Sequence, residues 1–104
     1  MTIIEKRQQI DDAIAALEKL NGEASLADTP VINDAIIKLI AKKELIITDS
    51  WDEFKIKITD EDFEKLKDSK AAIDDATIAE QAKIEKVNQG IAIGKKILGV
   101  LKMI

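Results

Sequence analysis

The sequence predicts an all-α fold, a small bundle of about four amphipathic helices that forms a single helical domain over residues 1–104. Apolar residues recur every three to four positions along most of the chain, which is the period of an α-helix. Capping-box patterns, in which Ser or Thr precedes Glu by three residues, mark several helix starts. Hydrophobic residues make up 46% of the chain and only three residues are aromatic, so we expect one aliphatic core.

The first helix is predicted over residues 3–20. Thr2 and Glu5 form a capping-box pattern at its start. Asn21 and Gly22 follow its last apolar residue and favour a helix end there. The apolar residues that share one face at 100° per residue are Ile3, Ile10, Ala13, Ile14, Leu17 and Leu20.

The second helix is predicted from Pro30 to about Lys43. Asp28 or Thr29 is a suitable N-cap, and proline fits the first helical position because its missing N–H costs nothing there. The apolar arc consists of Ile32, Ala35, Ile36, Leu39 and Ile40, with Val31 and Ile37 at its sides. This arc is wider than one contact requires, so we expect the helix to touch two neighbours near the centre of the fold.

Residues 44–59 fit two interpretations. The alternation in Phe54-Lys55-Ile56-Lys57-Ile58 is typical of a half-buried strand and would form a minor β-hairpin at 45–58. Ser50 and Glu53 instead repeat the capping-box spacing and favour a short helix. The sequence alone leaves both open.

Residues 60–88 are predicted to be helical. Thr59 is a good N-cap, and the acidic residues that follow it suit the positive end of the helix dipole. The apolar pattern weakens further on, which leaves one long helix or two helices separated near Asp74-Asp75. Gly90 allows a bend, and its spacing from Gly94 is also suited to close helix packing.

The last segment, residues 91–104, is predicted to be an amphipathic cationic C-terminal helix. Its lysines are Lys95, Lys96 and Lys102, and its apolar half contains Ile93, Ile97, Leu98, Val100, Leu101 and Ile104. An apolar face of this size needs cover. Three kinds of cover fit this face: the first two helices of the same chain, another protein or a second copy of this chain, or a membrane surface.

The composition excludes most catalytic and metal-binding chemistry. The chain has no His, Cys or Tyr, which removes the commonest general base, thiolate ligands and disulfides. The acidic run from Asp60 to Glu64 lacks the glycine of an EF-hand calcium loop, because position six is Lys65. We therefore predict no catalytic residue, no metal site, no cofactor, no small-molecule substrate and no enzymatic activity.

Charge and hydropathy restrict the partners and the location. The net charge of −4 argues against nucleic-acid binding, which needs a positive face. The N-terminus lacks the apolar core of a signal peptide, and no stretch reaches the ~20 apolar residues that cross a bilayer. A cytoplasmic location is expected.

The predicted function is a non-enzymatic helical interaction module that binds another protein or itself. The predicted apolar contact surface consists of Ile97, Val100, Leu101 and Ile104, with Trp51 as a possible anchor. The alternative is a protein that binds a membrane surface through residues 91–104. In that case Lys95, Lys96 and Lys102 contact anionic lipid.

Overall fold

A computed structural model describes all 104 residues, and every regular element in it is helical. The four long helices are α1 (Ile3–Glu23), α2 (Thr29–Leu45), α4 (Asp60–Asp74) and α5 (Glu80–Leu101). A π-helical turn, η1 (Ile46–Ser50), and the short helix α3 (Trp51–Lys57) connect α2 to α4. The predicted all-α bundle is confirmed.

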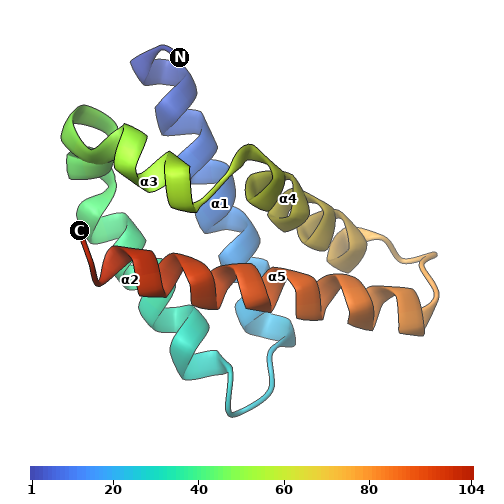
Figure 1. Cartoon of the computed structure of the whole chain (residues 1–104). Helices are drawn as coiled ribbons and strands as arrows, with labels where there is room; N and C mark the ends of the chain where they lie inside the picture. Colours follow the sequence, from blue (N-terminus) through green and yellow to red (C-terminus); the bar gives the residue numbers. More distant parts are fainter.

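The long helices are arranged as a ring around one core. Helix α1 packs against α2 and α4, and α5 packs against the same two helices, so that α1 and α5 lie diagonally opposite and also touch (Figure 1). The turn η1 contacts α1, α2 and α3 at one end of the bundle. As predicted, α2 has two long-helix neighbours. No helix combines the length and apolar content that a membrane-spanning segment requires.

Two of the predicted helix starts are confirmed by their hydrogen bonds. The Thr2 hydroxyl accepts from the Glu5 backbone N–H at 3.1 Å, and the Glu5 carboxylate accepts from the Thr2 N–H at 3.0 Å. Thr59 and Asp62 make the same reciprocal pair at the start of α4. Helix α1 extends to Glu23, three residues beyond its predicted end, because Gly22 keeps a negative φ and continues the helix.

The hairpin alternative at 45–58 is wrong. Phe54 and Ile58 lie one helical turn apart and are both fully buried, whereas Ile56 is 78% exposed. A half-buried strand would place all three side chains on the same face. The helical period therefore accounts for this burial and the strand period does not. The Ser50 side chain makes no capping hydrogen bond, so α3 forms without the capping box that Ser50 and Glu53 predicted.

Residues 60–88 form two helices, with the break at residues 75–79. The Asp75 carboxylate accepts hydrogen bonds from the Thr77 backbone N–H and the Thr77 hydroxyl, at 2.9 and 2.7 Å. Such local bonds compete with helical ones and favour a turn. Helix α5 then runs without interruption through Gly90 to Leu101, so the predicted C-terminal helix is the second half of a longer one.

Gly90 and Gly94 allow α5 to lie close to its neighbours. A Cβ atom added at Gly90 would lie 2.6 Å from the Ser69 hydroxyl oxygen and 2.8 Å from a Leu20 methyl carbon. One added at Gly94 would lie 2.6 Å from a methyl carbon of Ile32. The G-x-x-x-G spacing therefore serves close packing inside this bundle.

Candidate interaction surface

The apolar residues predicted as a contact surface lie in the core of the chain itself. Ile97 and Leu101 are fully buried, Val100 is buried, and Ile104 is half-buried against the core. Helix α5, which carries the first three of them, packs against α2 and α4 and also contacts α1. The cover is thus provided by the same chain, although α4 and α2 supply more of it than the first helix, α1, which was expected to share it with α2.

Trp51 is also buried, at the first residue of α3. The ammonium groups of Lys6 and Lys55 lie 5.4 and 5.5 Å from its ring centroid, which is cation–π distance. Trp51 therefore covers the end of the core near η1 and is not an exposed anchor.

Two of the three lysines predicted to contact lipid are paired with carboxylates of the same chain. The Lys95 ammonium lies 2.9 Å from an Asp28 oxygen and lowers the pKa of that carboxyl. The Lys96 ammonium lies 2.7 Å from an oxygen of Asp62. Lys102 is exposed and makes no ion pair.

Asp62 is the more buried of these two carboxylates. It has two structural roles, since it caps the start of α4 and pairs with Lys96 of α5. Burial raises the pKa of Asp62. The hydrogen bonds from the Lys96 ammonium and the Thr59 backbone N–H lower it by more than burial raises it, so the pKa lies below its usual value of 3.8. A lowered folded-state pKa stabilises the fold above pH 3.8, and this contribution is lost as the pH falls through the folded-state pKa.

We expect Asp62→Asn to lower the free energy of unfolding by about 1 kcal/mol at pH 7, a value reduced for the exposure of Lys96. The wild-type and variant stabilities should converge as the pH is lowered from 4 towards 2. Urea unfolding followed by circular dichroism at several pH values measures this. Asp28→Asn, at the exposed pair, is the control and should show a smaller effect. A difference between wild type and Asp62→Asn that does not change with pH would contradict the assignment.

An apolar surface that was not predicted from the sequence lies on the solvent side of α2, and we name it the α2 stripe: Ile37, Ile40, Ala41 and Leu45. Ile37, Ile40 and Leu45 are 56%, 54% and 45% exposed. Their spacing is that of one helix face, and the exposed residues Asn33 and Thr48 lie on this face at its two ends, while the exposed Glu44 lies on it beside Ile40. The width of the apolar arc on α2 was the sequence signal for this surface, because two neighbouring helices cover only part of so wide an arc.

Charged side chains border the α2 stripe on both edges. On the edge toward α1, Arg7 pairs with Glu44, and Lys43 lies 2.6 Å from Asp11. On the edge toward α5, Lys38 lies 2.8 Å from Asp34.

Lys42, also on the edge toward α5, connects α2 to the end of α5 through hydrogen bonds. Its ammonium donates to the backbone carbonyls of Leu101 and Ile104 at 2.7 and 2.8 Å. These carbonyls lie at the C-terminus of α5, where a helix leaves acceptors unpaired. The bonds hold the last residues of the chain beside the α2 stripe.

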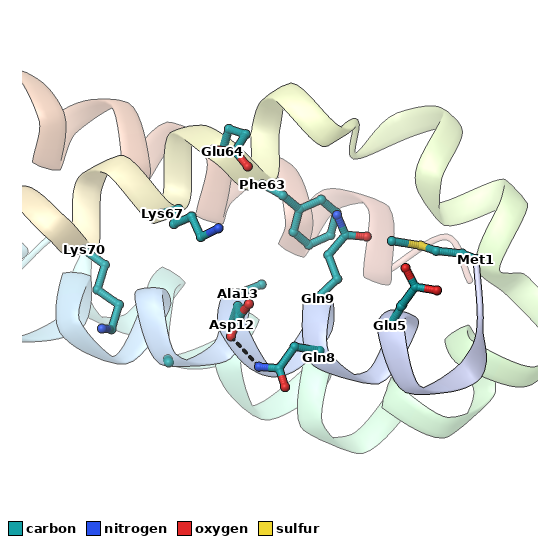
Figure 2. A pocket seen from close by; sticks show the side chains of 11 residues that line it. Met1, Glu5, Gln8, Gln9, Asp12, Ala13, Phe63, Glu64, Lys67 and Lys70 are labelled. Atoms are coloured by element: carbon teal, nitrogen blue, oxygen red, sulfur yellow. Dashed lines mark hydrogen bonds between the residues drawn. The ribbon is translucent and has the colours of Figure 1, made fainter.

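A second surface feature is a groove of about 440 Å³ between α1 and α4. Figure 2 shows Phe63 and Ala13 between its walls and Lys70 extending from α4 toward α1. Gln8 and Asp12 on α1 bind each other at 2.8 Å. The walls mix both signs of charge without converging on one point, and no three Asp or Glu residues of the chain gather as metal ligands. The groove therefore specifies no ligand chemistry.

The α2 stripe is the surface whose composition points most clearly to binding, because it joins large exposed apolar side chains on one rigid helix. Its interpretation depends on the geometry of this chain alone. No protein family model, curated protein or solved structure matches the sequence or the fold.

Proposed function

We propose that this protein is a non-enzymatic helical interaction module that binds another protein, or a second copy of itself, through the α2 stripe. The observation that supports the proposal is the row of half-exposed Ile37, Ile40 and Leu45 on one helix face. Contiguous exposed apolar residues with a polar rim are typical of protein interaction sites. The cytoplasmic location expected from the sequence is part of this proposal.

The energy available at the stripe fits a binding site. Full burial of a large aliphatic side chain contributes roughly 1.5–3 kcal/mol, so covering the exposed half of each of three side chains contributes about 1 kcal/mol apiece. The stripe lies on a helix fixed by packing on both sides, so little conformational entropy is lost when a partner covers it.

Ile40→Glu tests the proposal, because it places a charge in the stripe at a position that the core does not use. We expect photo-cross-linking from position 41 to give partner or dimer adducts in the wild type and at least tenfold fewer in Ile40→Glu. Sedimentation over a range of concentrations separates dimers from complexes with other proteins.

The matched control for that experiment is Ile84→Glu, since Ile84 is 50% exposed but lies on α5 away from the stripe. We expect it to leave the adducts unchanged. Equal loss of adducts in both variants, or no loss in either, would refute the proposal.

The membrane-surface alternative now requires α5 to leave the core, since its apolar face is enclosed and Lys95 and Lys96 are paired. Co-sedimentation with anionic and neutral vesicles tests it. Binding to anionic vesicles accompanied by loss of the folded core would favour it over the α2 stripe.

A further inference from the structure

We infer that the partner of the α2 stripe is an amphipathic helix whose apolar face is flanked on one side by a row of acidic residues. This inference depends on the proposed function and adds the chemistry of the partner. It is drawn from the shape of the stripe and from the uneven charge along its two edges.

The stripe has the dimensions of a helix-binding face. Ile37, Ala41 and Leu45 follow one another at intervals of four residues and span about 12 Å along the helix. Ala41 in the middle is small, so a partner helix can approach the α2 backbone closely there. A partner with apolar residues at i, i+3 or i+4, and i+7 matches this spacing.

The edge toward α5 has an excess of positive charge. Lys38 and Lys42 lie one turn apart on it, and the exposed Lys102 directly follows Leu101, whose carbonyl accepts from Lys42. Asp34 is the carboxylate paired on this edge, with Lys38, while Lys102 makes no ion pair. An acidic row on a partner helix would complement this edge.

The edge toward α1 is balanced, because Arg7 is paired with Glu44 and Lys43 with Asp11. A partner helix can carry its acidic residues only on the side that meets the lysine edge, whereas a lipid surface would also bring anionic head groups against Glu44 and Asp11. The charges of the two edges together therefore favour an acidic protein helix over an anionic membrane.

A second copy of the chain packed antiparallel on this surface fits it less well. A twofold axis through two antiparallel α2 helices brings each edge against the same edge of the other copy. Lys38, Lys42 and Lys102 would then face their own counterparts, and like charges across an interface are repulsive. An acidic partner avoids this repulsion and pairs the same lysines.

Binding of synthetic helical peptides tests the inference. Two fluorescent peptides of about 18 residues, five helical turns, share one apolar stripe, and one carries glutamates along one flank of that stripe where the other carries lysines. We expect anisotropy titrations to show that the full chain binds the glutamate peptide at least tenfold more tightly, with a difference that shrinks as salt is added. The Lys38→Glu/Lys102→Glu variant should reverse the preference, and Ile40→Glu should abolish binding of both peptides.

Ile84→Glu is again the matched control and should bind the glutamate peptide as the wild type does. Equal affinity for the two peptides, or binding to anionic vesicles in preference to the glutamate peptide, would overturn the inference. Dimerisation that depends on Ile40, with no binding of either peptide, would overturn the acidic-helix partner and leave the proposed function standing. Peptide binding that Ile40→Glu does not change would count against the proposed function itself.

Discussion

A chain truncated after Gly90 is expected to lose its cooperative fold entirely. The truncation removes six buried apolar side chains of α5: Ile91, Ile93, Ile97, Leu98, Val100 and Leu101. Burial of each contributes roughly 1.5–3 kcal/mol, so about 9–18 kcal/mol of gross stabilisation is lost. Small domains have a net stability of about 5–15 kcal/mol. The loss is therefore comparable to the whole stability of the fold.

Thermal melting followed by circular dichroism measures this effect. The truncated chain should show reduced helicity and no sigmoidal transition, whereas the full-length Ile84→Glu variant should melt as the wild type does. A truncated chain that retained a cooperative transition near the wild-type melting temperature would show that residues 91–104 are not part of the core. In that case the apolar half of the segment would again be a candidate binding surface.

Two chemically identical substitutions on α5 should have opposite effects on stability. Gly90→Ala places a methyl group 2.6 Å from the Ser69 oxygen, and that hydroxyl lies within donating distance of the carbonyls of Lys86 and Lys65, at 2.7 and 2.9 Å, which share its one proton. We expect it to destabilise the fold by about 1–3 kcal/mol through overpacking. Gly99→Ala meets no atom within 4 Å and should stabilise the fold by up to about 1 kcal/mol through helix propensity.

Urea unfolding of both variants measures the change in the free energy of unfolding, which should have opposite signs in the two. Because each substitution adds the same methyl group to the same helix, the comparison separates the effect of close packing from that of propensity. A stability increase in both variants would mean that α5 does not approach α4 and α1 as closely at Gly90 as described. Destabilisation in both would mean that the surroundings of Gly99 are more crowded than the structure shows.

The local signals of the sequence predicted α1 and α4 well. Thr2 and Thr59 each begin a helix through a reciprocal bond with an acid three residues on, and this pattern needs no knowledge of the rest of the fold. The position of Pro30 in the first turn of α2 is equally local. Such features are decided by neighbouring residues, so one sequence is enough to predict them.

The secondary structure of residues 44–59 could not be predicted because the strand period and the helical period both fit the same residues. Phe54 and Ile58 are compatible with both a strand face and a helical turn, and only the exposure of Ile56 separates the two. That exposure depends on where the rest of the bundle provides cover. The choice is therefore made by tertiary packing, which overrides a short alternating pattern.

The candidate site was not predicted for a related reason. The apolar arcs of α2 and α5 look alike in sequence, and the predicted contact surface was placed at Ile97, Val100, Leu101 and Ile104 of the last segment. In the fold, α5 is enclosed, whereas the other side of α2 retains Ile37, Ile40 and Leu45 at the surface. Periodicity identifies an apolar face, but only the number of neighbours around a helix determines how much of that face is covered.

The ring arrangement also has a consequence for biosynthesis. Helix α5 supplies core contacts to α2 and α4 and touches α1, so the other three long helices have no complete core until residues 91–101 have been made. A ribosome-bound nascent chain that ends before this segment should remain protease-sensitive. Folding would then wait until α5 has left the ribosome, and the incomplete chain would expose apolar surface during translation.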